Sequence, residues 1–223
     1  MNGIEHLKWD SDFFGKKIGR LKCEKLSMNP KDIDMGDYDL VYIFSKEELN
    51  PYWDDCFMDK KMNIHIDHKS ETPVLDPNII EIFKPQREAE LEKLVLLNGQ
   101  RSRFYLDPKL KHKYEELYLK WGEKCFNFET NRTWYYIIEN QLAGFFTMDV
   151  SQKYFAELCT IHPNHLRKGI AEKLLRNGFN EVSKNSISNI RISYQGGNLP
   201  AQKMYDKLGF KPYEVWYVYH LWK

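Results

Sequence analysis

The sequence predicts an α/β (α+β) fold, with a mixed central sheet flanked by helices and a smaller N-terminal α/β domain. Strand-like runs and helical patterns alternate through the second part of the chain, which is typical of such a fold. A length of 223 residues allows one large domain or two small ones. The segment 71–78 contains two prolines and several turn formers, as in a linker. We therefore expect an N-terminal domain at 1–78 and a main domain at 79–223.

The N-terminal domain is predicted to contain two strands, Asp39–Phe44 and Met62–Asp67, with a helix between them. Ser45 and Glu48 have the spacing of a capping box, in which each side chain satisfies a free backbone donor of the other residue. This spacing predicts that the helix begins just after the first strand.

Two helices are predicted at the start of the main domain. Arg87–Leu97 is rich in helix formers, and Lys109–Cys125 carries an apolar stripe at helical spacing. Gly99–Asp107, between them, combines charged and aromatic residues and is predicted to be a loop.

The rest of the main domain alternates strands and helices. We expect strands at Trp134–Ile138, Leu142–Val150, Tyr154–Ile161, Asn189–Tyr194 and Val215–Trp222, and helices at 169–184 and Leu199–Leu208. The last strand is rich in aromatic residues, and it either completes the sheet or forms the edge of a homodimer.

Composition excludes several classes of protein. Lys and Arg total 33 against 32 Asp and Glu, so no strong field attracts nucleic acid or an anionic membrane. No apolar run approaches the roughly 18 residues of a membrane span, and the first ten residues lack the apolar stretch of a signal peptide. The four cysteines lie far apart, which favours reduced thiols and a cytoplasmic protein. The two His-x-x-His pairs lack partners at zinc-ligand spacing, so we expect no metal.

The strongest chemical signal is a basic turn that contains a glycine and precedes a helix. Its sequence is His165-Leu166-Arg167-Lys168-Gly169-Ile170-Ala171. The N-terminus of a helix has free N–H groups and a partial positive charge, and glycine allows a ligand to approach the backbone closely. The turn therefore predicts a diphosphate site, although similar turns also occur without a ligand.

A second motif lies on the later helix, where residues 198–210 read N-x-x-A-x-x-x-Y-x-x-x-G-F. Ala201, Tyr205 and Leu208 fall on one helical face, and Gly209 has the position of a C-terminal cap. By itself this pattern also fits a helix whose tyrosine only packs in the core.

Together and in this order, the two motifs resemble the GNAT superfamily of N-acetyltransferases, where the turn is written Q/R-x-x-G-x-G/A. The resemblance implies acetyl-CoA as co-substrate. Backbone amides of Arg167, Lys168, Gly169, Ile170 and Ala171 would hold its pyrophosphate, the strand end Cys159-Thr160-Ile161 would pair with its pantetheine arm, and Asn198 would contact it. This sequence departs from the pattern at Leu166, usually Gln or Arg, and at Arg167, often Gly. A side-chain contact is thereby in question, but not the backbone cradle.

By the same resemblance, Tyr205 would protonate the departing thiolate. The reaction also needs a neutral amine, and positioned proton transfer typically contributes about 10²–10⁴-fold. Glu157, two residues before Cys159 on the same strand, is the candidate base, acting through water; a strand glutamate is otherwise exposed or paired.

The N-terminal half of the chain indicates which class of acceptor the enzyme uses, but only through a resemblance. Residues 7–15 and 102–108 are similar to segments of the dTDP-fucosamine acetyltransferases, which acetylate the 4-amino group of a dTDP-linked 4,6-dideoxy sugar for surface polysaccharides. Arg103 would then form a forked contact with the diphosphate, and Phe104 or Trp9 would stack on the thymine or sugar. An ion pair for Arg103 and core packing for Trp9 are the simpler alternatives. Another small amine, a protein N-terminus, or a non-catalytic CoA-binding module also stays open.

Overall fold

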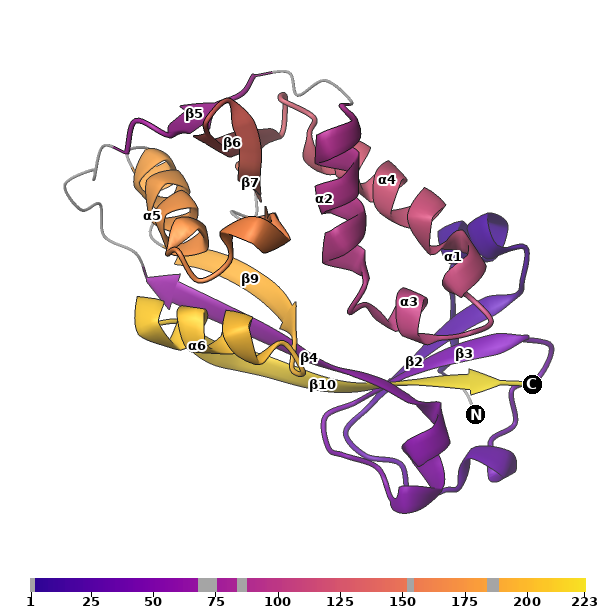
Figure 1. Cartoon of the computed structure of the whole chain (residues 1–223). Helices are drawn as coiled ribbons and strands as arrows, with labels where there is room; N and C mark the ends of the chain where they lie inside the picture. Colours follow the sequence, from indigo (N-terminus) through magenta and orange to yellow (C-terminus); the bar gives the residue numbers. More distant parts are fainter. Residues whose placement is uncertain (1–2, 68–75, 84–87, 152–154, 184–188) are drawn as a thin grey trace.

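The computed structural model describes residues 3–67, 76–83, 88–151, 155–183 and 189–223. Within these residues one sheet of ten strands has the order β1-β2-β3-β10-β4-β9-β8-β7-β6-β5 (Figure 1). The β2/β3 and β8/β9 pairs are parallel and the other neighbouring pairs are antiparallel. The strands are β1 Glu5–His6, β2 Ile18–Cys23, β3 Leu40–Ser45, β4 Phe57–Asp67, β5 Ile79–Glu81, β6 Asn131–Ile138, β7 Gln141–Asp149, β8 Phe155–Ile161, β9 Asn189–Gln195 and β10 Lys211–Trp222. The predicted mixed sheet flanked by helices is confirmed.

Helices cover both faces of the sheet. On one face α1 (Lys8–Phe14), α2 (Ala89–Gly99) and α4 (Tyr114–Cys125) bury one apolar cluster against β3, β7 and β8. Figure 1 shows α2 and α4 side by side above this face. On the other face α5 (Ile170–Ser183) and α6 (Leu199–Leu208) bury a second cluster against the strands from β4 to β7. The sheet therefore separates these two cores, and a third apolar cluster packs around Trp53 against β3 and β10.

The two halves of the chain share this sheet. β4 belongs to the N-terminal half but pairs with β10 on one side and β9 on the other. β5 begins directly after the proposed boundary at residue 78 and pairs with β6. The division into 1–78 and 79–223 stays a prediction, and most of the linker on which it depends, 68–75, lies outside the described residues.

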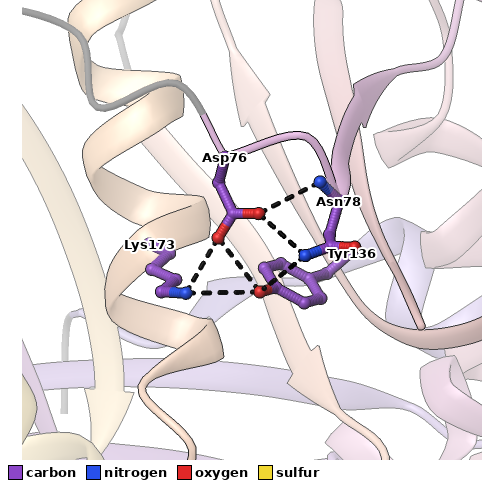
Figure 2. A network of polar contacts seen from close by, with 4 residues as sticks. All are labelled: Asp76, Asn78, Tyr136 and Lys173. Carbon is purple, nitrogen blue, oxygen red and sulfur yellow. Dashed lines mark hydrogen bonds and ion pairs between the residues drawn. The ribbon is translucent and has the colours of Figure 1, made fainter.

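A polar network at the end of that linker holds α5 against β6 (Figure 2). The Asp76 carboxylate accepts hydrogen bonds from Lys173 Nζ at 2.8 Å, from the Tyr136 hydroxyl at 3.0 Å and from Asn78. Burial alone would raise the pKa of the Asp76 carboxyl, but these hydrogen bonds outweigh it and lower the pKa to about 2. Asp76 thus links the first turns of α5 to the sheet.

The prediction of an α-helix after Ser45 is wrong. Residues 46–50 are not helical, and only a short 3-10 helix, Pro51–Cys56, precedes β4. Pro51 disfavours the α conformation in the residue before it, and the Asn50 side chain accepts a hydrogen bond from the Tyr52 N–H. The Leu49 N–H donates to the Tyr219 hydroxyl at 2.9 Å, so a tertiary contact replaces the helical bond.

The segment Gly99–Asp107 is not a plain loop as predicted. It contains a one-turn helix, α3 (Arg103–Leu106), whose first N–H groups are capped by Ser102. The predicted helix at 109–125 begins only at Tyr114, after a 3-10 turn at Lys111–Lys113. These differences are local, but α3 positions Arg103 in the candidate site.

The aromatic C-terminal strand completes the sheet. β10 lies between β3 and β4, so its backbone groups are paired on both sides and it does not form a free edge. Of the two alternatives for this strand, completion of the sheet is confirmed, and a dimer edge at β10 is excluded for the described fold. No described helix combines the length and apolar character that a membrane span requires.

Candidate active site

The sheet opens between β8 and β9. These parallel strands pair only at Phe155–Arg191 and Ala156–Ile192 among the described residues, and further along they diverge. Beside this gap lies a cavity of about 530 Å³, lined by Cys159 and Ile161 of β8, by Tyr194 of β9 and by residues of α5 and α6. A strand edge that has lost its neighbour can pair with an extended ligand. The gap therefore suits a chain-like molecule that carries amide groups.

One end of this cavity is the turn before α5. Arg167 has φ +61° and Gly169 has φ +75°, so left-handed residues alternate with others along the turn. Such a backbone directs successive N–H groups into one concavity, a common way to bind anions. In the described part of the chain the N–H groups of 167–169 find no backbone or side-chain acceptor. The turn is therefore free to bind a diphosphate at the helix N-terminus.

The opposite wall is formed by α6. The Asn198 side chain accepts a hydrogen bond from the Ala201 N–H at 3.3 Å and so caps the helix. Asn198 also lines the cavity. One helical stripe then presents Ala201, Met204 and Tyr205 toward the same space. Gly209 ends the helix with φ +89°, as its position in the sequence predicts.

Tyr205 lies in the deepest part of this wall. It is 7% exposed and its ring lies 5.3 Å from that of Tyr194. Burial, followed by the nearby Cys159 and Tyr194, raises the pKa of the Tyr205 hydroxyl above its usual range. Burial also raises the pKa of the Cys159 thiol to about 12. Both groups are therefore protonated at neutral pH.

A second cavity of about 240 Å³ adjoins the first. Its lining comes from β3, β4 and β10, from β9, from the start of β8, and from α3 and α4. Trp121, Ser193, Tyr194 and Gln195 line both cavities. The two spaces therefore meet at the divergence of β8 and β9.

Arg103 lines the second cavity. Its guanidinium lies 4.1 Å from the ring centroid of Tyr42 and 4.5 Å from that of Phe104, as in a cation–π arrangement. Its Nη1 atom is buried, and no hydrogen-bond partner for it exists among the described residues. Because an unpaired buried donor costs free energy, this nitrogen is suited to donate a hydrogen bond to an oxygen of a ligand.

Two further charges of this cavity come from β4. Burial raises the pKa of the Asp59 carboxyl to about 7, although Arg103, the Lys60 backbone and Lys61 oppose that rise. Burial and then the positive charge of Arg103 lower the pKa of Lys61. The cavity thus contains a carboxyl that titrates near neutrality between two cationic side chains.

Comparison with known proteins identifies the family. The profile of the Acetyltransferase (GNAT) family matches residues 94–210, just over half of the chain. This chain is a GNAT-family acetyltransferase. It therefore uses acetyl-CoA as its co-substrate, and the 530 Å³ cavity with its backbone turn fits that molecule. No match is found among curated protein sequences.

Solved structures share the fold of this acetyltransferase. A GNAT-family acetyltransferase from Novosphingobium aromaticivorans has a TM-score of 0.53 and 15% identity, over 85% of this chain and 76% of that one. A GCN5-related N-acetyltransferase from Sphaerobacter thermophilus has a TM-score of 0.53 and 10% identity, over 81% and 59% of the chains. A functionally unknown Staphylococcus epidermidis protein has a TM-score of 0.56 and 10% identity, over 83% and 73%. At such identities these structures establish the fold and not the acceptor.

Most of the predicted site residues of the acetyltransferase line one of the two cavities. In the first cavity are Cys159, Ile161, Arg167, Gly169, Ile170, Ala171, Asn198 and Tyr205, and in the second are Arg103 and Phe104. Thr160 instead accepts a hydrogen bond from Asn98, and the exposed Lys168 contacts His165. Trp9 is 55% exposed and stacks on Phe13 at 5.0 Å.

Glu157 lies away from both cavity linings. Between the Phe146–Cys159 and Met148–Ala156 pairs the register of β8 slips by one residue, as in a β-bulge. The Glu157 carboxylate accepts hydrogen bonds from the Trp121 indole at 3.3 Å and the Cys125 thiol at 3.7 Å, both on α4. Because of the bulge, the side chains of β8 do not alternate regularly between the two faces of the sheet. The prediction that Glu157 and Cys159 share a face depended on that alternation.

Three residues of the site have no signal in the sequence. Asn98 of α2 donates to the Cys159 carbonyl at 3.1 Å and lines the first cavity. Asp59 and Lys61 line the second but precede the strand predicted from Met62. Only the full extent of β4, from Phe57, places their side chains beside Arg103. Among the described residues no group of three or more His, Cys, Asp or Glu side chains is arranged to bind a metal ion.

Proposed function

We propose that this enzyme transfers the acetyl group of acetyl-CoA to the amino group of a nucleotide-linked amino sugar, such as dTDP-4-amino-4,6-dideoxygalactose. One observation carries the proposal: a cavity with an unpartnered buried guanidinium nitrogen, that of Arg103, meets the cofactor cavity at the strand gap. An amine bound there lies beside the place where a thioester would end. The negative diphosphate of the acceptor supplies the partner for Arg103.

For the cofactor we propose a largely backbone-built site. The pyrophosphate lies on the N–H groups of Arg167, Lys168, Gly169, Ile170 and Ala171, and the pantetheine arm pairs with the backbone of 159–161 in the gap beside β9. Asn98 holds the Cys159 carbonyl at 3.1 Å, which fixes the edge that the arm would meet. Asn198 contacts the arm from the start of α6.

The transfer that we propose is direct. The amine nitrogen attacks the thioester carbonyl, the C–S bond breaks, and the departing sulfur takes the proton of the Tyr205 hydroxyl. The proton that the nitrogen loses as the amide forms returns through water to Tyr205. A backbone N–H of β8 would stabilise the oxyanion, a contribution of about 3 kcal/mol in other acyl-transfer sites.

The shape of the second cavity supports an acceptor that lies only partly inside the protein. Its 240 Å³ is below the roughly 300 Å³ at which pockets for whole drug-sized ligands begin. A row of rings leads outward from Phe104 through Phe14 at 5.8 Å and Phe13 at 4.9 Å to Trp9. We propose that the sugar enters the cavity, the diphosphate meets Arg103 and the thymine stacks on Trp9.

Two carboxylates compete for the role of base. Glu157, expected from the sequence, would act through a water molecule held on the side of Trp121. Asp59 lines the acceptor cavity itself. A cytoplasmic location and a role in surface polysaccharide synthesis follow if the nucleotide sugar is the acceptor.

The experiment that tests this function is CoA release from acetyl-CoA with a panel of amines. The panel contains the dTDP-linked amino sugar, the same sugar without nucleotide, an aminoglycoside and a peptide with a free N-terminus. We expect release only with the nucleotide sugar, and thermal protection of the protein by dTDP. Release with the peptide and no protection by dTDP would assign a protein N-terminus as acceptor instead.

A further inference from the structure

We infer that the Asp59 carboxylate accepts the proton of the acceptor's ammonium group before the acetyl group is transferred. This inference rests on the proposed function, because it assumes an amine in the second cavity. It assigns a role to a residue of the N-terminal half of the chain, on β4, and it places the base on the acceptor side of the sheet.

The position of Asp59 follows from the register of the sheet. Asp59 pairs with Val218 of β10, and two residues further along β4 Lys61 pairs with Gln195 of β9. Residues two apart on a strand point to the same face, so both side chains reach the second cavity, which they line. Gln195 lines both cavities. The line of residues from Asp59 through Lys61 to Gln195 therefore runs toward the place where the two cavities meet.

The surroundings of Asp59 suit a carboxyl that exchanges a proton. Its charged neighbours are Arg103 of α3 and Lys61 of β4, and Tyr118 of α4 and Tyr194 of β9 belong to the same lining. The neighbours from β3 and β10 are the apolar Phe44 and Val218. Burial among these groups raises the pKa of Asp59 to about 7, close to the value at which a general base works best at neutral pH.

The proton balance is complete with the groups named. The ammonium group of the acceptor gives one proton to Asp59 and becomes the neutral amine. The amine forms the C–N bond, the C–S bond breaks, and sulfur takes the proton of Tyr205. The nitrogen's second proton restores Tyr205 through water, and Asp59 releases its proton to solvent. The products are the N-acetylated acceptor, CoA and one proton.

Asp59 and Tyr205 then act from opposite sides of the gap. Tyr205 lines the cofactor cavity and Asp59 the acceptor cavity, and Tyr194 lines both. Glu157 by contrast is held by two donors from α4, and lies outside both linings.

The test compares Asp59→Asn and Asp59→Glu with Glu157→Gln, which removes the competing carboxylate, and with the surface control Asp55→Asn, an exposed residue outside both linings. We expect Asp59→Asn to lower kcat/KM at pH 7 by at least about tenfold and to move the acidic limb of the pH profile up to the pKa of the acceptor's own ammonium group, because the free amine must then form unaided. Asp59→Glu should restore part of the rate with a shifted acidic limb. Asp55→Asn should keep the wild-type rate and profile, and Glu157→Gln should leave the position of the acidic limb unchanged.

Affinity for acetyl-CoA and the thermal midpoint of each variant control for misfolding, and a purely structural role would not move the acidic limb. If Asp59→Asn keeps the wild-type rate and profile while the wild type turns over, the inference is overturned and the proposed function stands. A shift of the acidic limb in Glu157→Gln and not in Asp59→Asn also overturns the inference. If the wild type acetylates no amine of the panel, the proposed function fails and the inference with it.

Discussion

The two cavities that meet at the strand gap are built in different ways. The cofactor cavity takes most of its wall from one stretch of chain, 159–207, and combines the left-handed turn before α5 and the Asn198 cap with charged side chains such as Arg167 and Lys203. The second cavity, where we propose that the acceptor binds, takes its charged groups from separate segments, Asp59 and Lys61 of β4 and Arg103 of α3. One site is therefore built mostly from residues close in sequence, and the other from distant segments brought together.

This difference bears on the departures of the enzyme from the family pattern. Leu166 and Arg167 replace the residues most frequent in the turn, yet Arg167 adopts φ +61°, the conformation that a glycine takes easily. A cofactor contact made by the backbone would be compatible with these side chains. In the second cavity, removing a charge would remove the proposed contact itself. Substitutions on the two sides should therefore have different kinetic signatures.

The largest effect on kcat is expected from the tyrosine of the cofactor cavity. Tyr205→Phe should lower kcat by about tenfold or more and leave the affinity for acetyl-CoA nearly unchanged, since only a transition-state interaction is removed. Steady-state kinetics together with a direct binding titration would measure both. An unchanged kcat, with chemistry rate-limiting, would exclude Tyr205 as the acid.

Arg103 tests the acceptor side alone. Arg103→Ala should raise the KM for the nucleotide sugar by roughly 10–100-fold, because a charge-assisted hydrogen bond in a buried site contributes about 1.5–3 kcal/mol. Arg103→Lys should recover part of the loss, since it keeps the charge but not the forked geometry. Acetyl-CoA binding serves as the control for folding and should be unaffected. Equal losses for both substrates would contradict the separation of the two sites.

Asp76 lies outside both cavity linings. A substitution there tests the contact between α5, which contributes to the cofactor cavity, and the sheet. The pKa of the Asp76 carboxyl, about 2, is below the ordinary 3.8, so its network stabilises the fold above pH 4 and that contribution is lost as pH falls from 4 to 2. Asp76→Asn should reduce the free energy of unfolding at pH 7 by about 1–2 kcal/mol, after allowance for solvent screening, and by nothing near pH 2. Urea unfolding at both pH values measures this, and an equal loss at both would exclude the ionic network as the cause.

The smallest effect is expected in the turn before α5. Gly169→Ala adds a Cβ that meets no atom within 4 Å, so only the cost of a left-handed conformation, about 1–2 kcal/mol, acts against the cradle. We expect acetyl-CoA binding to weaken by several-fold. Arg167→Gly should change it less, because glycine adopts that backbone freely. Calorimetric titration ranks the two, and a greater loss for Arg167→Gly would show that its side chain, and not the backbone, holds the cofactor.

Predictions from the sequence were accurate where local spacing decides structure. The helix Leu199–Leu208 has the predicted bounds, and Asn198 and Gly209 act at its two ends as capping chemistry requires. The helix predicted after Ser45 failed because Pro51 and the bond from Leu49 to Tyr219 favour another backbone path. Four short or extended segments, β1, β2, β5 and the first half of β4, were missed. For β5 and the first half of β4 the reason is that their partners, β6 and β10, lie far away in sequence.

The sequence by itself determined the fold class and located the glycine-containing turn and the tyrosine of α6, because each depends on residues a few positions apart. Only the tertiary structure revealed the second cavity, where we propose that the acceptor binds. Asp59, Lys61 and Arg103 are brought together by the placement of β4 between β10 and β9, and the bulge in β8 turned Glu157 toward α4. Strand register and burial set these positions, and both are properties of contacts between segments far apart in the chain.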